Sequence, residues 1–334
     1  MRKSIAWSTD LTLIEETDMP KSSIRTLLAA AAVLCSAIAP ASAEDTQQPK
    51  ANIDFLKIDA DITLRRMVVH NPRPKGTVLF LHGFPETLYA WKDVSLALGN
   101  DYEVHAFDWP GYGLSSRPAV DRFSYAPKDY ARVLNEYVMR ADIDTSKLTI
   151  YATDIGALPA LLLALEKPDI AKTIIVGDFA PFNRPQYMYE SLQSLKVAGA
   201  TGQARAQLNK NRADILENAL RRGLPQEAQF EVSQEFKDDM ANGWNHGALT
   251  TADAFSYYYS HFTRDQDHFE SQLARFNTPV NVVWGEKDLY IKKEMGLELA
   301  SRLPAKLNLL AGVGHYPHLQ SPKQTIEEVR ASFR

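Results

Sequence analysis

The chain has 334 residues, and 37 basic against 41 acidic side chains give a formal net charge of −4 at pH 7. With 45% hydrophobic and 23% charged residues, its composition is that of a folded globular protein and is too apolar for a disordered one. A pI of about 6.1 excludes a broad basic surface for nucleic acid, and a mean hydropathy of −0.28 excludes a polytopic membrane protein. The length allows two domains or one large α/β domain.

The first 43 residues are predicted to be an N-terminal extension followed by a secretory signal peptide. Lys21 and Arg25 provide a positive segment, and residues 26–39 form an apolar run that is too short to cross a bilayer core of about 30 Å. The sequence ASA at 41–43 is a small-residue cleavage signal. The alternative is a buried N-terminal helix, but the order of charge, apolar run and cleavage signal favours the signal peptide.

This signal peptide would run from about Met19 to Ala43, with cleavage after Ala43. We therefore expect a periplasmic or secreted protein. The only cysteine, Cys35, lies in the removed segment, so the mature chain would carry no thiol. A thiol-free chain suits an oxidising compartment and excludes a cysteine nucleophile or a thiolate metal site.

From residue 44 onward, apolar runs of strand length alternate with segments of helical spacing. Two strands are expected within 54–70, and further strands at 77–81, 102–107, 148–152, 173–176, 280–284 and 307–310. Helices are expected at 127–141, 155–165, 292–302 and 322–333. Strands that alternate with helices predict a parallel sheet with helices on both faces.

The interval 183–270 breaks this alternation, because it is polar and helix-forming with few β-branched runs. It predicts a helical cap, or lid, inserted between two strands of the sheet. The core would then consist of two parts, 44–182 and 271–334. The cap surface could also form a homodimer, because the sequence does not separate its pocket-facing positions from its outward-facing ones.

A candidate nucleophile lies in the sequence ATDIG at 152–156, between a predicted strand and a predicted helix. Small residues on both sides of Asp154 permit a tight turn that lifts one side chain above the sheet, as in a nucleophile elbow. The alternative is an ordinary helix N-cap, a position that aspartate also favours. The motifs around it favour the elbow.

Two motifs follow the strands that precede this turn along the chain. In HGFPE at 82–86, the backbone N–H of Phe84 would pair with that of Ile155 as oxyanion donors. His82 is expected to form structural hydrogen bonds rather than to act as a base, and it is also a candidate to contact the substrate or the leaving group. Trp109, in the loop at 108–118, is a candidate to line the pocket.

Two later motifs supply a candidate base and its acid. His315 lies in a Gly-containing loop before the terminal helix, where a general base would sit, and His318 is the weaker candidate. Asp288, in GEKD at 285–288, is placed to orient His315 and to stabilise its imidazolium form. Asp178, which follows the strand at 173–176, competes with Asp288 for this role.

Taken together, these motifs resemble the α/β-hydrolase superfamily, and within it the branch with an aspartate nucleophile: epoxide hydrolases and haloalkane or haloacetate dehalogenases. The order Asp154, Asp288, His315 matches nucleophile, acid and histidine. The resemblance covers 54–182 and 271–334 and implies the α/β-hydrolase fold, a mostly parallel eight-stranded sheet with helices on both faces and an inserted helical cap. The DIG sequence of the elbow and the signal peptide also resemble those of a secreted subgroup of bacterial epoxide hydrolases.

The aspartate indicates the reaction class. A carboxylate with a pKa of about 3.9 is ionised at neutral pH and suits displacement at a saturated carbon. Asp154 would form an ester with the substrate, and His315 would activate the water that hydrolyses it. We expect a small hydrophobic epoxide as substrate, and no metal, cofactor, nucleic acid or membrane partner. The alternatives are a haloalkane or haloacetate dehalogenase with the same mechanism, and a hydrolase-fold binding module without turnover.

The resemblance also bears on the leaving group and on the third acid. Epoxide hydrolases usually carry two proton donors on the cap, and Tyr258 is the best match for one of them. No donor stands near 192–194, where the other is expected, and Tyr187 or Tyr189 is the candidate substitute. For the third acid we favour the position of Asp288, which is the commoner arrangement in the superfamily, although several dehalogenases and the secreted epoxide hydrolases use the position of Asp178.

Overall fold

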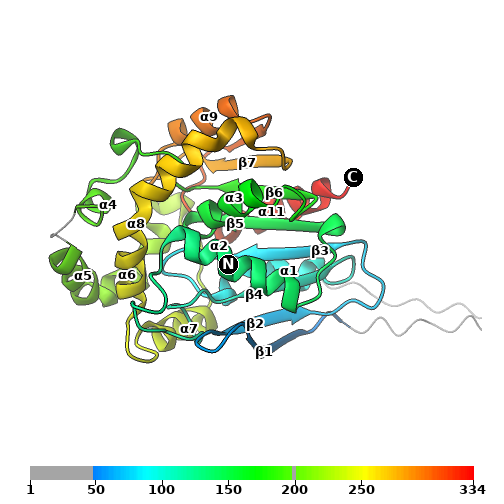
Figure 1. The fold of residues 1–334 in the computed structure, drawn as a ribbon, viewed down its shortest axis with the longest axis horizontal. Coiled ribbons are helices and arrows are strands. Elements are labelled where there is room, and N and C mark those ends of the chain that lie inside the picture. Colours follow the sequence, from blue (N-terminus) through cyan, green and yellow to red (C-terminus); the bar gives the residue numbers. More distant parts are fainter. Residues whose placement is uncertain (1–47, 198–200) are drawn as a thin grey trace, which may run out of the picture. The chain divides into compact units, whose positions relative to one another are not determined.

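The structure is a computed structural model that describes residues 48–197 and 201–334. The predicted extension and signal peptide at 1–43 lie outside these residues. In the described part, eight strands form one sheet in the order β1-β2-β4-β3-β5-β6-β7-β8 (Figure 1). This confirms the predicted mostly parallel sheet.

The antiparallel pairs lie at one edge of the sheet. There β1 (Ala51–Lys57) pairs with β2 (Thr63–Val69), and β2 pairs with β4 (Glu103–Phe107). All other neighbours are parallel, and these strands are β3 (Thr77–Leu81), β5 (Leu148–Thr153), β6 (Thr173–Gly177), β7 (Val280–Gly285) and β8 (Lys306–Leu310). From β3 onward, each strand differs from its predicted range by at most one residue at either end.

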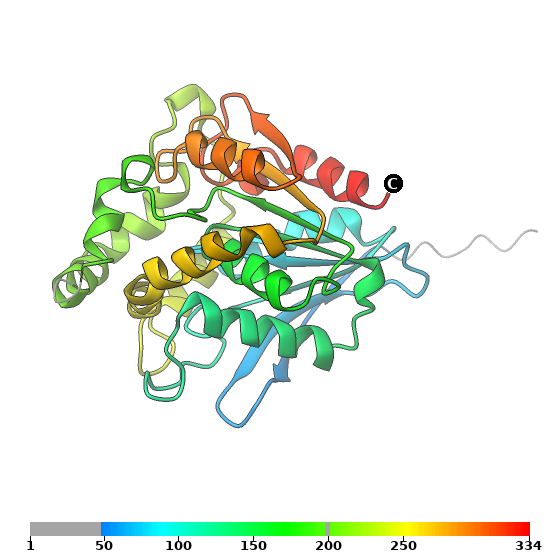
Figure 2. The same cartoon turned by 45° about the horizontal axis from the view of Figure 1, so that its top comes forward.

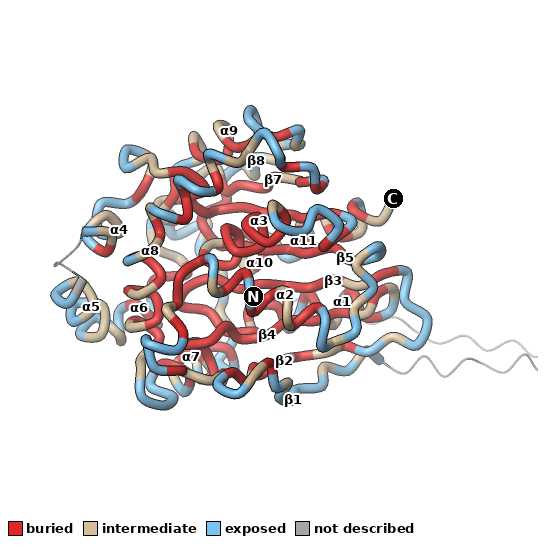
Figure 3. Tube along the Cα trace, in the orientation of Figure 1, coloured by how far each residue is buried: buried red, intermediate tan, exposed pale blue. Residues whose placement is uncertain are grey.

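Burial explains why the strands could be predicted from the sequence. Every residue of β5 and β6 is buried, whereas the edge strand β1 is largely exposed (Figure 3). Along β3, Leu79 and Leu81 belong to one apolar core, and Val78 and Phe80 belong to a second core on the opposite face. The continuous apolar runs therefore reflect a sheet that is covered on both sides.

Helices cover both faces of the sheet (Figure 2). The first core receives side chains from α2 (Pro127–Arg140), α3 (Ala157–Glu166) and α9 (Lys293–Arg302). The second receives them from α1 (Lys92–Leu98) and α11 (Pro322–Ser332), which α10 (Pro317–Gln320) precedes. Short 3-10 turns occur at η1 (Leu88–Trp91), η2 (Thr145–Lys147), η3 (Asp154–Gly156), η4 (Pro185–Tyr187), η5 (Ala219–Arg221), η6 (Gln226–Ala228) and η7 (Leu273–Arg275).

Between β6 and β7 the chain is helical, in the interval where the sequence predicts a cap. The helices are α4 (Glu190–Ser194), α5 (Thr201–Lys210), α6 (Arg212–Asn218), α7 (Gln234–Trp244) and α8 (Thr251–Gln272). Figure 1 shows α4 to α7 gathered at one end of the sheet. A reciprocal capping box of Thr250 and Asp253 fixes the start of α8. None of the helices in the described ranges has the length and hydropathy that crossing a membrane requires.

A buried charge network joins α7 to the sheet. The Arg65 side chain of β2 donates from Nε to Asp108 at 2.5 Å and from both terminal nitrogens to the Asp239 carboxylate at 2.7 Å. The Thr87 hydroxyl donates to the same carboxylate at 2.5 Å. Because Arg65 is almost fully buried, its charge is tolerable only while these carboxylates compensate it.

We expect Asp239→Ala to lower the free energy of unfolding by about 3 kcal/mol, because it leaves part of a buried guanidinium without a partner. The matched control is Asp54→Ala, which removes the exposed ion pair with Arg66 and should cost less than about 1 kcal/mol. Urea unfolding of both variants measures the difference. Equal losses in the two variants would contradict the buried-network interpretation.

Candidate active site

The sequence motifs meet at the carboxyl ends of the parallel strands. Asp154 follows β5 directly and has φ +48°, a left-handed conformation that is uncommon for a residue with a side chain. Steric crowding explains why glycines surround this turn. A Cβ on Gly83 would lie 2.6 Å from the Asp154 Cβ, and a Cβ on Gly156 would lie 3.0 Å from the Leu81 Cβ. A side chain at Gly83 would collide with Asp154, and one at Gly156 would fit only if its neighbours moved by a few tenths of an ångström.

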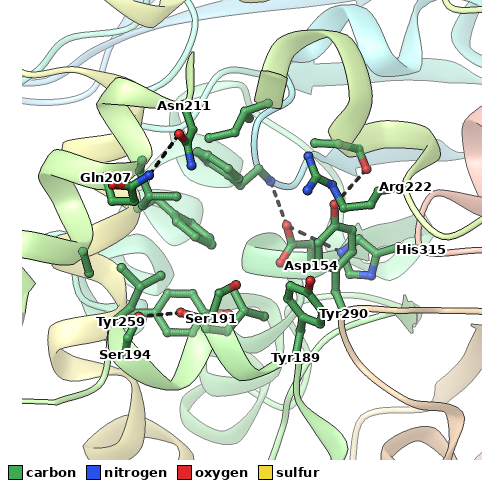
Figure 4. A pocket seen from close by; sticks show the side chains of 18 of the residues that line it. Asp154, Tyr189, Ser191, Ser194, Gln207, Asn211, Arg222, Tyr259, Tyr290 and His315 are labelled. Atoms are coloured by element: carbon green, nitrogen blue, oxygen red, sulfur yellow. Dashed lines mark hydrogen bonds and ion pairs between the residues drawn. The ribbon is translucent and has the colours of Figure 1, made fainter. Parts of the chain in front are cut away.

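A cavity of about 210 Å³ lies above this turn (Figure 4). Core residues of its lining include Asp154, Phe84 and His315, and cap residues include Phe255 and Tyr259. Much of the remaining lining is apolar, with Leu192, Leu195, Leu208, Ile215 and Ile291. A carboxylate in a largely apolar cavity suits a small hydrophobic substrate.

Two groups converge on one oxygen of Asp154. The backbone N–H of Phe84 donates to Oδ2 at 2.8 Å, and Nε2 of His315 lies 3.9 Å from the same Oδ2 (Figure 4). The Ile155 N–H makes no hydrogen bond to this carboxylate, and the Ile155 carbonyl accepts from the Tyr258 hydroxyl at 3.1 Å. The structure therefore brings Phe84, Asp154 and His315 together, as the sequence predicts.

Behind His315 stands Asp288. Nδ1 of His315 lies 2.8 Å from Oδ2 of Asp288, and Oδ1 of Asp288 accepts from the N–H groups of Tyr290 and Ile291 at 2.8 and 3.0 Å. Burial alone would lower the pKa of His315, but the charges of Asp288 and Asp154 outweigh it and raise that pKa well above its usual range. The imidazolium form of His315 is thus strongly stabilised.

Asp178, the competing acid, lies beside this pair but is not the hydrogen-bond partner of His315. It is fully buried; Oδ1 accepts from the Gly285 N–H at 2.9 Å, and Oδ2 has no hydrogen-bond partner among the described residues. Burial and the neighbouring Asp288 charge raise the pKa of Asp178 well above its usual range. Burial and the neighbouring carboxylate therefore favour the protonated form of Asp178.

The same cluster has the composition of a metal site. Within the described residues, Asp178, Asp288 and His315 offer ligand atoms that lie within 4.8 Å of one another. However, the Asp288 carboxylate already accepts three hydrogen bonds, one of them from His315. The arrangement matches an acid–histidine pair better than a vacant coordination sphere.

Three residues predicted to contact substrate do not line the cavity. The Tyr258 hydroxyl is bound to the Ile155 carbonyl, and the Trp109 indole N–H donates to the His82 carbonyl at 3.2 Å. His82 is fully buried between the Gly83 carbonyl, 2.8 Å from Nδ1, and the Trp109 backbone N–H, 3.3 Å from Nε2. Their substrate role stays a prediction that these contacts do not support, and the contacts of His82 fit the structural hydrogen bonding also expected of it.

Tyr259 lines the cavity in place of Tyr258. Phe255 and Tyr259 are one helical turn apart on α8 and face the same side, and Phe255 stacks on Phe84 with ring centroids 4.0 Å apart. Successive residues on a helix point about 100° apart, so Tyr258 faces the elbow instead. The spacing from Phe255 is the signal that could have identified Tyr259. Burial and the charge of Asp154 raise the pKa of Tyr259 well above 10, so its hydroxyl stays protonated.

Of the two candidates for the other donor, Tyr189 lines the cavity and Tyr187 does not. In the described residues, the hydroxyl groups of Tyr189 and Tyr259 have no protein acceptor, whereas that of Tyr290 donates to the Ala219 carbonyl at 3.0 Å. Figure 4 shows Tyr189 and Tyr290 on the His315 side of the cavity. The structure thus leaves two phenols available to a ligand.

Comparison with known proteins places this geometry in context. Residues 76–322 match the family described as alpha/beta hydrolase fold. A fluoroacetate dehalogenase of a Burkholderia species is 34% identical over 106 residues, which is 31% of this chain and 34% of that protein. Epoxide hydrolase 1 of Caenorhabditis elegans is 22% identical over 274 residues, 77% of this chain and 64% of that protein. The alignments thus span about a third to two thirds of these relatives.

Solved structures share the fold more completely. Cfl2 of Burkholderia cenocepacia superposes with a TM-score of 0.71 at 21% identity, covering 87% of this chain and 98% of that chain. The epoxide hydrolase CorEH superposes with a TM-score of 0.69 at 16% identity, covering 85% and 99%. The chain therefore belongs to the α/β-hydrolase fold family, with distant similarity to epoxide hydrolases and to haloalkane and fluoroacetate dehalogenases.

Proposed function

We propose that this protein is a secreted epoxide hydrolase that opens small hydrophobic epoxides to diols through an ester on Asp154. One observation carries the proposal: the Asp154 carboxylate faces the cavity while the Phe84 N–H and the His315 imidazole approach its Oδ2. Secretion rests on the sequence at 19–43 alone.

In the first step, the Asp154 oxygen that Phe84 does not hold attacks an epoxide carbon. A new C–O bond forms, the ring C–O bond breaks, and its electron pair goes to the epoxide oxygen. This alkoxide needs a proton, which Tyr259 supplies, with Tyr189 as the second donor from the cap side. Burial of the Tyr259 phenol keeps it in the protonated form that this role requires.

In the second step, His315 takes a proton from water, and the hydroxide adds to the ester carbonyl carbon. Negative charge develops on Oδ2, which the Phe84 N–H already contacts at 2.8 Å. Collapse of the tetrahedral species breaks the bond between Cγ of Asp154 and the diol oxygen, which takes the proton from His315. The proton left on the new carboxyl group returns through solvent to the Tyr259 phenolate, so that carboxylate, imidazole and phenol are all restored. Asp288 stabilises the imidazolium that His315 becomes.

Ester formation prepares His315 for its role as a base. In the free enzyme, two carboxylates, Asp288 and Asp154, raise the pKa of His315. The ester of Asp154 is neutral, so one of these charges disappears when water must be activated, and the pKa of His315 falls. The histidine is thereby deprotonated over a wider pH range in the step that needs it neutral.

The cavity favours an epoxide over an alkyl halide. A departing halide takes no proton and needs N–H donors, whereas an alkoxide needs acids. Two phenols line the cavity, and no tryptophan of the described residues does. The indole of Trp109 donates to the His82 carbonyl instead.

The ester is tested by trapping it. We expect His315→Gln, incubated with an aryl epoxide, to gain the mass of the epoxide on the peptide that contains Asp154, because nucleophilic attack is intact and hydrolysis is not. Mass spectrometry of the digested protein measures the adduct. An adduct from an alkyl halide alone would favour dehalogenation, and no adduct from either substrate would favour a binding module.

The assignment of the proton donor is tested by removing single hydroxyl groups. We expect Tyr259→Phe to slow ester formation from an epoxide by about 100-fold, since a general acid contributes at least that much. Tyr257→Phe is the matched control on the same helix, because Tyr257 contacts Arg205 rather than the cavity. Rapid-quench measurement of the ester gives both rates. If Tyr259→Phe reacts as fast as the control, Tyr259 is not the donor.

The two acids are separated by the same conservative change. Asp288→Asn should lower turnover by about 10³-fold, because the imidazolium loses its charged partner. Asp178→Asn should change turnover by less than about threefold, because Asp178 makes no hydrogen bond to His315 and its amide oxygen can still accept from the Gly285 N–H. Full activity in Asp288→Asn would show that the assignment is wrong.

The pH dependence gives a further check on this pair. His315 must be neutral to act as a base, so ester hydrolysis is slow below its pKa and rises as pH increases through it. Removing the Asp288 charge lowers that pKa, and the acid limb of hydrolysis in Asp288→Asn should therefore move to lower pH. Single-turnover rates across pH measure the shift.

A further inference from the structure

A second acid–histidine pair lies buried below the cavity, and the mechanism above does not use it. Nε2 of His318 lies 2.6 Å from Oε1 of Glu86, and both side chains are fully shielded from solvent. The other Glu86 oxygen accepts from the Gly83 N–H at 2.8 Å. Neither residue lines the cavity, so neither meets the substrate.

The pair joins the two loops that carry the reacting groups. Glu86 stands two residues after Phe84, and His318 stands three residues after His315. A second bond links the same loops, from the Tyr316 hydroxyl to the Phe84 carbonyl at 2.7 Å. His318 also stacks on Trp91, with ring centroids 4.1 Å apart.

The electrostatics require the pair to stay together. Burial alone would raise the pKa of Glu86, but His318 and the Gly83 N–H outweigh it and hold that pKa below its usual range. Glu86 is therefore ionised, and since a carboxylate only accepts, the hydrogen in the bond belongs to His318. Separation would leave a charge buried with a single partner, which is strongly destabilising.

The location of the Gly83 bond explains why the pair is useful. Gly83 must lack a side chain, because Asp154 lies against it, and glycine gives the backbone its greatest conformational freedom. The next residue is Phe84, whose N–H must point at Asp154. The close approach of Asp154 requires glycine at position 83, and glycine makes the backbone of this loop flexible. The hydrogen bond from the Gly83 N–H to Glu86 restricts that flexibility.

We propose that Glu86 and His318 are positioning residues, a buried clamp that holds the Phe84 N–H and the His315 imidazole in register on the same oxygen of Asp154. The proposal rests on the ester mechanism above. Ester formation needs the nucleophile and the proton donors of the cap. Ester hydrolysis needs the Phe84 N–H and His315 together, and it is this step that the clamp supports.

The test separates the two steps in variants of the pair. In His318→Phe, which keeps the stacking on Trp91, we expect ester hydrolysis to slow by 10- to 100-fold, as a misplacement of about 1 Å does. Ester formation should stay within about twofold. Rapid-quench single turnovers with an aryl epoxide, followed by mass spectrometry of the Asp154 peptide, measure both rates.

Two further variants distinguish positioning from stability. Glu86→Leu with His318→Phe replaces the pair by apolar side chains and should recover stability but not the rate of hydrolysis. The single variant Glu86→Gln keeps an acceptor for the Gly83 N–H. It should retain most of the wild-type rate of ester hydrolysis. Thr149→Val removes a buried hydrogen bond to Ser332 at the start of β5 and should lower stability without slowing hydrolysis.

The outcomes separate the clamp from the proposed function. Wild-type hydrolysis in the folded double variant, or an equal loss in both steps, would overturn the clamp while leaving the ester mechanism intact. Absence of an ester even in His315→Gln would instead overturn the proposed function. Slow hydrolysis with normal ester formation in the double variant would support the clamp.

Discussion

The arrangement of the candidate active site depends on the position of one carboxylate oxygen, Oδ2 of Asp154. A backbone N–H and an imidazole, which come from opposite ends of the sequence, approach this single atom at 2.8 and 3.9 Å. Such convergence is possible because β3, β5 and β8 run parallel and end at the same edge. The left-handed turn at Asp154 and the two glycines packed against it are the local cost of lifting the carboxylate into the cavity.

The carboxyl groups near His315 lie in different electrostatic environments. Asp288 is hydrogen-bonded to His315, whereas burial and the neighbouring Asp288 raise the pKa of Asp178 well above its usual range. Two adjacent buried carboxylates repel each other when both are ionised, and this repulsion favours the protonated form of Asp178.

The core and cap contribute differently to the cavity. The core side supplies Asp154, Phe84 and His315 through backbone geometry that hydrogen bonds fix on several sides. The cap side supplies phenols and apolar side chains from helices, where a change of one position rotates a side chain out of the cavity. The strand ends thus carry the groups at which the proposed mechanism begins, and the helices above them shape the cavity.

The sequence by itself determined the sheet and brought forward the groups that the proposed mechanism uses. Strands buried on both faces produce apolar runs such as Leu148–Thr153, and a catalytic turn between a strand and a helix requires small residues on both sides of Asp154. Sequence reasoning missed α1, which is a short helix of one to two turns, and it named Tyr258 where Tyr259 faces the cavity.

Only the tertiary structure decided which acid serves His315, which tyrosine reaches the cavity, and what Glu86 and His318 bind. Each of these is a contact between segments far apart in the chain, set by packing distance and by the rotation of a helix about its axis. The local sequence does not encode packing distance or helix rotation. The same residues are compatible with a given strand or helix whichever segment packs against it.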